Sequence, residues 1–197
     1  DTKDQLEPFR SEWFIFTDDE TRICGSLDML FVNTMIMETL WQQVEFGANA
    51  PDTLHVCLYD WKVAKNISKF MPGGKYAKGP CSGYSDTNYY QYALQLNTYK
   101  YIMENFCGNV VWKGKTYKNI HVDVMALVQL YNTQRKYKRI PVGNMQKTVK
   151  AMMEMRRESL ALQRRGEPGL WPFDATQPEP EPEPVRVQPT QIDYDTF

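Results

Sequence analysis

Hydrophobic and polar positions divide the chain into short apolar runs that are separated by turns. Residues 12–17 and 22–32 are rich in aromatic and branched side chains, and the acidic residues 18–20 separate them, so we predict two strands in a hairpin. Residues 53–63 are apolar on both faces, as expected for a central strand. Residues 120–131 and 135–142 predict two further strands.

Two segments have the three- and four-residue spacing of a helix. In residues 87–107, apolar side chains recur on one face at Tyr92, Leu96, Tyr99, Met103 and Phe106. Asp86 is the expected N-cap and Gly108 the expected C-terminal stop. A second helix is expected from Asn144, as its cap, to residue 165. Residues 35–46 fit either a short helix or a long loop.

The order of these elements is three strands, a helix, a strand or strand pair, and a helix. This order predicts an α/β or α+β domain with a central mixed sheet flanked by helices. Residues 178–184 alternate proline with glutamate, a pattern that forms neither a helix nor a sheet ladder. We therefore expect one domain over residues 1–174 and a disordered tail over residues 175–197.

The chain has 197 residues and a net charge of −1, but residues 175–197 carry five acids and one base. The remaining residues carry 22 bases and 19 acids, a balance that permits a polyanionic partner. No apolar stretch is long enough for a membrane span, and no secretory signal is recognisable. Four cysteines without a CxxC pair favour buried reduced thiols in an intracellular protein, of the cytoplasm or nucleus.

Common catalytic motifs are absent from the sequence. It contains no phosphate-binding GxxxxGK[ST], no GxGxxG, no GxSxG and no HExxH. His55 and His121 are the only histidines, and we interpret them as a residue of a strand core and a residue at a strand start. The remaining candidates for chemistry are carboxylates and lysines.

Asp60 and Lys62 are two residues apart in the third predicted strand, so both side chains lie on one face. Asp28 interrupts an apolar run in the preceding strand, and if the strands are neighbours it can meet Asp60. Two close carboxylates repel each other, and oxygen ligands favour Mg²⁺ or Mn²⁺. From the residues alone, the alternative is that each acid pairs separately with a lysine.

Three motifs in this order resemble the PD-(D/E)XK nuclease superfamily, and in particular its RecB-like and lambda-exonuclease-like branch. They are Gly25-x-x-Asp28, Asp60-x-Lys62 and Gln95-x-x-x-Tyr99. The resemblance covers residues 12–140 and implies a restriction-endonuclease-like core of a helix, three strands, a helix and a strand. Residues 1–11 are too short for the first helix, so we expect that part of the domain lies upstream of Asp1.

The resemblance also implies roles for individual residues. Asp28 and Asp60 would bind Mg²⁺ or Mn²⁺, with the main-chain carbonyl of Trp61 as a further ligand. Lys62 would orient the attacking water or stabilise charge on the phosphate. Glu12 corresponds to an additional acid of some members, although an exposed acid of an edge strand is an equal alternative. Gln95 and Tyr99 would contact Lys62 or the DNA.

Basic residues concentrate near the fifth predicted strand, where they suit contacts with DNA phosphates. They are Arg135, Lys136, Lys138 and Arg139. A solvated turn at the end of a strand is the alternative interpretation. The resulting expectation is a Mg²⁺- or Mn²⁺-dependent deoxyribonuclease, an exonuclease in preference to an endonuclease, in recombination, repair or viral DNA processing. A non-catalytic nucleic-acid-binding module and an RNA endonuclease of the same fold are the two alternatives.

Overall fold

The computed structural model describes residues 5–70, 74–132 and 135–170, and the predicted tail lies outside this part of the chain. It has α+β architecture, with a five-stranded mixed sheet flanked by helices. The sheet order is β1-β2-β3-β6-β7, where the strands span Leu6–Phe16, Cys24–Asn33, Thr53–Val63, Asn119–Leu130 and Lys138–Pro141. The predicted fold class is therefore confirmed at this level.

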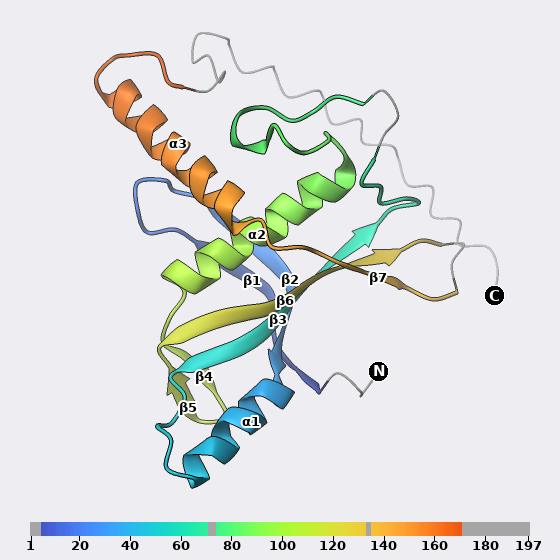
Figure 1. The fold of residues 1–197 in the computed structure, drawn as a ribbon, viewed down its shortest axis with the longest axis vertical. Helices are drawn as coiled ribbons and strands as arrows, with labels where there is room; N and C mark the ends of the chain where they lie inside the picture. Colours follow the sequence, from blue (N-terminus) through green and yellow to red (C-terminus); the bar gives the residue numbers. More distant parts are fainter. Residues whose placement is uncertain (1–4, 71–73, 133–134, 171–197) are drawn as a thin grey trace, which may run out of the picture.

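Strands β3 and β6 form the centre of the sheet and run parallel, whereas all other neighbours are antiparallel. Helix α2 (Asn88–Phe106) connects them, because parallel strands need a long crossover. Helices α2 and α3 (Gln146–Arg164) lie over one face of the sheet, while α1 (Thr34–Glu45) lies at one end of it (Figure 1). The main core lies between α2 and this face, with Leu58, Leu96 and Leu127 fully buried.

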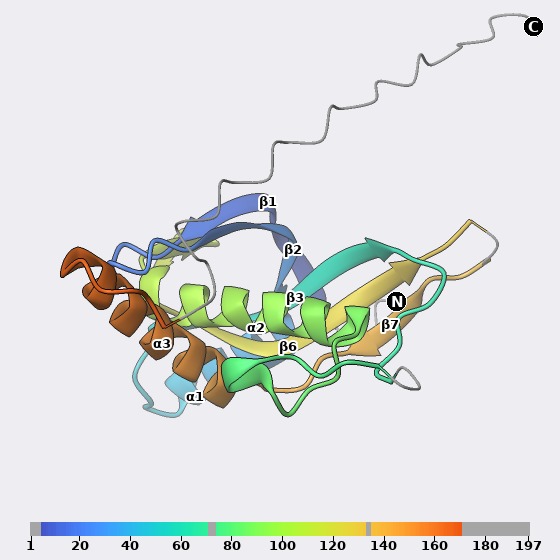
Figure 2. The same ribbon diagram turned by 90° about the horizontal axis from the view of Figure 1, so that it is seen from above.

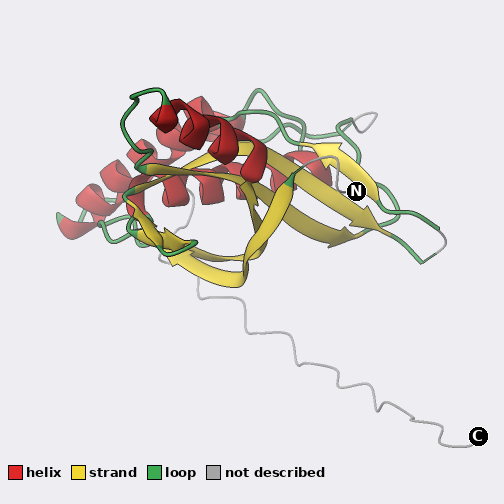
Figure 3. Ribbon diagram, turned by 90° about the horizontal axis from the view of Figure 1, so that it is seen from below, coloured by secondary structure: helices red, strands yellow, loops and turns green. Residues whose placement is uncertain are grey.

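The opposite face of the sheet is covered differently. A smaller apolar cluster there includes Cys57, Tyr59, Ala126 and Val128. The sheet curls, so that strands β1 and β2 arch away from the plane of β3 and β6 (Figure 2). Figure 3 shows that the curled strands enclose a concave surface on the side away from α2.

The strand and helix predictions differ in accuracy along the chain. Strand β3 has the predicted bounds of residues 53–63. Residues 35–46, which fitted either a helix or a loop, form most of helix α1. Strand β7 is shorter than predicted, because Arg135 and Lys136 precede it. A hairpin of β4 (Val110–Trp112) and β5 (Lys115–Tyr117) was not anticipated.

Both predicted helix caps were wrong in detail. The N-cap of α2 is Thr87, whereas the Asp86 carboxylate accepts a hydrogen bond from Gln91 in the helix. The N-cap of α3 is Met145, although Asn144 Oδ1 accepts the main-chain N–H of Gln146. Side-chain caps predicted from residue type therefore shifted by one residue.

The cysteines and the described helices bear on two further expectations. All four cysteines are free thiols, as predicted, but only Cys57 and Cys81 are buried, whereas Cys107 is half-buried and Cys24 is exposed. In residues 5–70, 74–132 and 135–170, none of the helices combines the length and apolar character that crossing a bilayer requires.

Candidate active site at the ends of strands β2 and β3

Asp28 and Asp60 meet where strands β2 and β3 separate. The regular pairing of these strands runs from Val32 opposite Val56 to Met29 opposite Tyr59. Beyond that point, Asp28 Oδ2 accepts a hydrogen bond from the main-chain N–H of Trp61 at 2.7 Å. The carboxylate of Asp28 therefore occupies the gap that the diverging backbones leave.

A chain of side chains extends from Asp60 to helix α2. Lys62 Nζ lies 2.7 Å from Asp60 Oδ2 and donates to Gln95 Oε1 at 3.1 Å. The Gln95 amide in turn donates to the Tyr99 hydroxyl at 3.0 Å. The i, i+2 spacing on β3 and the i, i+4 spacing on α2 place these four side chains between the sheet and the helix.

Gly25 belongs to the same arrangement through its lack of a side chain. A Cβ atom at this position would lie 2.3 Å from Cε1 of Tyr99, far closer than non-bonded carbon atoms approach. Gly25 in β2 thus leaves the space that the Tyr99 ring fills. The Gly25–Asp28, Asp60–Lys62 and Gln95–Tyr99 motifs are therefore in mutual contact.

The site holds Asp60 in a poor environment for a negative charge. This side chain is almost fully buried, and burial is the main reason why the pKa of its carboxyl is raised. The neighbouring charge of Asp28 raises the pKa further, whereas Lys62 opposes the shift. Burial likewise raises the pKa of the Tyr99 hydroxyl. Lys62 is the cation that offsets the two adjacent carboxylates.

The oxygen atoms at this site suit a small, hard cation. Peptide groups alternate in direction along a strand, so the Trp61 carbonyl lies on the same edge of β3 as its N–H, which bonds Asp28. Mg²⁺ needs one or two carboxylates, its remaining ligands being water and substrate oxygens. Asp28, Asp60 and the Trp61 carbonyl are the groups that could hold such an ion. In the described residues, no cluster of three or more His, Cys, Asp or Glu side chains suits a metal.

Glu12 lies level with Asp28 on the neighbouring strand. Its neighbours Ser11 and Trp13 pair with Met29 and Leu27, so Glu12 falls opposite Asp28 in the β1–β2 register. Its side chain is exposed, and its φ of 48° lies in the left-handed region. This backbone interrupts the regular alternation of β1 next to the carboxylates. Glu12 therefore lies beside the site but forms no hydrogen bond or ion pair with the described residues of the site.

The sheet register separates the four predicted basic residues. Lys138 pairs with Gln129, which pairs with Lys62, so Lys138 lies on the face that carries Asp60, two strands away. Arg139 is on the opposite face, where its guanidinium lies 5.1 Å from the Tyr59 ring centroid. Arg135 and Lys136 are exposed before β7 begins. The four residues therefore do not form one surface.

Two contributors to the site were missed in the sequence. The Tyr92 ring lies 4.8 Å from Lys62 Nζ, one helical turn before Gln95. Gln129 is buried, and its amide donates to the carbonyls of Ala64 and Lys65, which fixes the chain directly after Lys62. A buried amide in the otherwise apolar run of β6 was the available signal for Gln129.

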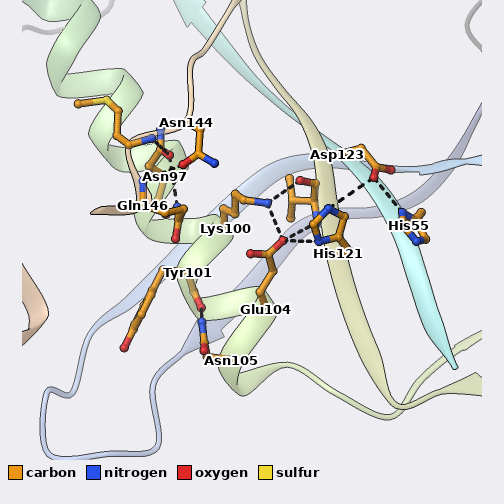
Figure 4. Close-up of polar contacts among 12 residues, drawn as sticks. His55, Asn97, Lys100, Tyr101, Glu104, Asn105, His121, Asp123, Asn144 and Gln146 are labelled. Carbon is orange, nitrogen blue, oxygen red and sulfur yellow. Dashed lines mark hydrogen bonds and ion pairs between the residues drawn. The ribbon is translucent and has the colours of Figure 1, made fainter. Parts of the chain in front are cut away.

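A second polar cluster occupies the other end of α2 and the beginnings of β3 and β6 (Figure 4). Glu104 accepts hydrogen bonds from Lys100 and from the main-chain N–H of Val122, and it lies 3.0 Å from His121 Nδ1. Asp123 lies 2.8 Å from His55 Nδ1 and also accepts a hydrogen bond from Asn33. His55 is therefore a half-buried residue within hydrogen-bonding distance of Asp123, which corrects its interpretation as a histidine of a strand core.

Comparisons with known proteins found no matching family model, no matching curated protein and no matching solved structure.

Proposed function

We propose that this protein is a Mg²⁺- or Mn²⁺-dependent nuclease that hydrolyses phosphodiester bonds of DNA. The observation that supports the proposal is the contact between three motifs that are distant in the sequence. Asp28, Asp60 and Lys62 lie together, and Gln95 from α2 bonds directly to Lys62. The resemblance to PD-(D/E)XK nucleases rests on the same motifs, and a restriction-endonuclease-like core belongs to this proposal.

Asp28, Asp60 and the Trp61 carbonyl would hold the metal ion. When bound, the ion neutralises phosphate charge and lowers the pKa of a coordinated water. In the protein alone, Lys62 does not fully offset the cost of burying the Asp60 carboxylate, whose pKa is raised. A cation at this position would stabilise the charged form of Asp60. The Trp61 N–H orients the Asp28 carboxylate through its 2.7 Å hydrogen bond.

Lys62 would face the phosphate from the side of α2. Its ammonium group is held by Asp60, by Gln95 Oε1 and over the Tyr92 ring, so little reorganisation is needed when substrate arrives. Gln95 and Tyr99 are positioning residues, because they reach the reacting groups through Lys62. A positive charge fixed in this way stabilises the negative charge that develops on the phosphate oxygens.

The experiment is digestion of linear duplex DNA, closed circular DNA and RNA, with Mg²⁺, with Mn²⁺ and with a chelator. We expect metal-dependent loss of linear DNA by the wild type and none by Asp60→Asn, because a neutral amide is a poorer ligand for a hard cation. Protection of circular DNA would identify an exonuclease. Cleavage of RNA alone would establish the RNA endonuclease. Tight DNA binding without cleavage would establish the non-catalytic module.

A further inference from the structure

The concave face of the sheet, opposite α2, carries a second surface with distinct chemistry. A groove of about 950 Å³ opens there between the β6–β7 side and the first residues of β1. Its walls combine aromatic, aliphatic and cationic side chains with the carboxylates of Glu7 and Glu38. The lining residues include Tyr59, Trp61, Val128, Leu130, Tyr137 and Arg139.

The groove uses the alternate residues of the strand that carries the candidate active site. Because side chains alternate along a strand, Tyr59 and Trp61 face the groove while Asp60 and Lys62 face α2. Trp61 is 41% exposed and Tyr137 is 59% exposed, so both residues present surface to solvent. Exposed aromatic side chains that gather in a groove are typical of a surface that binds a ligand or partner.

Positive charge gathers at one end of the groove. A smaller cavity of about 400 Å³ shares Leu130 and Tyr137 with it and adds Arg135 and Lys136. Arg139 of β7 lines the main groove itself. At the other end, Lys113 is neutralised by an ion pair with Glu7 at 2.7 Å. The groove is therefore aromatic along its floor and cationic where it reaches the β6–β7 turn.

We propose that this groove binds single-stranded DNA, with bases stacked on Trp61 and Tyr137 and phosphates near Arg135, Lys136 and Arg139. Aromatic rings bind unpaired bases irrespective of sequence, and basic residues follow the backbone. A duplex presents no free base faces to such rings. If a second copy of this chain occupied the groove, the basic side chains of the two copies would face each other, which is unfavourable.

The inference rests on the proposed function for its choice of DNA, and it gives that function a substrate class. Strand β3 would carry the cleavage site on one face and hold an unpaired segment of the same substrate on the other. A nuclease that binds a single strand next to its active site would act on DNA that is already unpaired, or on duplex ends where the two strands separate.

The test measures binding in the presence of a chelator, so that cleavage plays no part. The probe is a fluorescent dT oligonucleotide of about 15 nucleotides, a length within the range that such grooves bind. Trp61→Ala and Tyr137→Ala should each weaken its binding by at least about fivefold, the effect of losing one stacked base. Affinity for a duplex of equal length should stay nearly constant, because phosphate contacts remain. Tyr76→Ala is the matched control, since Tyr76 is 64% exposed outside the groove.

The inference would be overturned if the Trp61→Ala/Tyr137→Ala double variant bound the oligonucleotide as tightly as the wild type. Equal weakening of single-strand and duplex binding would also overturn it, as would tighter binding of RNA than of dT. Concentration-dependent self-association that Tyr137→Ala abolishes would instead identify a second copy as the occupant. Failure of the proposed function is distinguishable, because an inactive protein can still bind dT in this way. Conversely, if the protein is an active nuclease but its affinity for dT is unchanged by Trp61→Ala and Tyr137→Ala, only the proposed role of the groove is refuted.

Discussion

The two ends of helix α2 each hold a lysine and carboxylates against the sheet, but they satisfy these charges differently. At the C-terminal end, Glu104 has Lys100, His121 and the Val122 N–H as partners, and Asp123 has His55 and Asn33. At the N-terminal end, two adjacent carboxylates have Lys62 and one main-chain N–H. Complete pairing is typical of structural clusters, whereas under-compensated acids indicate a place for a ligand.

The largest expected difference between the two ends concerns activity. Lys62→Ala should reduce cleavage by roughly a thousandfold or more, because a fixed charge near the phosphate is lost. The variant should still fold, since Lys62 lies at the end of β3, but its melting temperature should fall because the buried Asp60 carboxylate loses its cation. The measurement is single-turnover cleavage of linear DNA with Mg²⁺, with unfolding by circular dichroism as the control. Normal cleavage by this variant would remove Lys62 from the mechanism.

The corresponding change at the other end should act on stability. Glu104→Ala leaves the Val122 N–H and the largely buried Lys100 ammonium short of a partner. We expect a loss of about 2 kcal/mol in the free energy of unfolding, or roughly thirtyfold in the folding equilibrium. Urea denaturation measures it. The folded fraction should cleave DNA at the wild-type rate, and a specific loss of cleavage would contradict the structural role of this cluster.

A smaller effect is expected for the residue that positions Lys62. Gln95→Ala removes both the acceptor for Lys62 and the donor to Tyr99. Cleavage should fall by more than about tenfold at little cost in stability, because Gln95 is only partly buried. Gln95→Glu restores the acceptor and should recover part of the rate. Should Gln95→Ala unfold the protein while its folded fraction cleaves normally, Gln95 is structural.

The smallest effect is on the pH dependence of stability without metal. The pKa of Asp60 is raised by burial, so this group favours folding most below its ordinary value of 3.8, and that contribution is lost as pH rises through the folded pKa. Asp60→Asn should therefore raise the melting temperature at pH 7 and change it little near pH 3.5. Asp19 should behave oppositely. Burial alone would raise its pKa, but hydrogen bonds from Thr21 and Arg157 lower it to about 2.

Asp19 thus stabilises the protein above pH 3.8, and that stabilisation disappears as the pH falls towards 2. Asp19→Asn should lower the melting temperature at pH 7. Thermal scans of both variants from pH 3 to pH 8, with a chelator present, measure the two signs. A lower melting temperature for Asp60→Asn at pH 7 would show that Lys62 fully compensates the buried carboxylate.

Local patterns predicted the parts of the fold that local physics determines. The buried strand β3 and the long helix α2 follow directly from apolar periodicity, and the shared face of Asp60 and Lys62 follows from strand alternation. The short β4–β5 hairpin has too few residues for a periodic signal. Strand alternation also separates Lys138 from Arg139, but which face of the sheet each one takes depends on the register between β6 and β7, which no local pattern encodes.

The candidate site could be predicted only in part for the same reason. The contact between Gly25 and Tyr99 joins residues from β2 and α2, so it depends on how the helix packs on the sheet. The anchoring of the chain after Lys62 by Gln129 likewise needs the β3–β6 pairing. The groove that contains Trp61 exists because the sheet curls, a property of the whole sheet rather than of any strand.

Calorimetric titration with Mn²⁺ tests most directly the claim that the carboxylates of β2 and β3, and not those near the C-terminal end of α2, form the functional site. We predict that the wild type binds Mn²⁺, that Asp60→Asn loses this binding, and that Asp123→Asn retains it. Lys62→Ala should also retain it. Absence of Mn²⁺ binding by the wild type, or its loss in Asp123→Asn with retention in Asp60→Asn, would contradict the account.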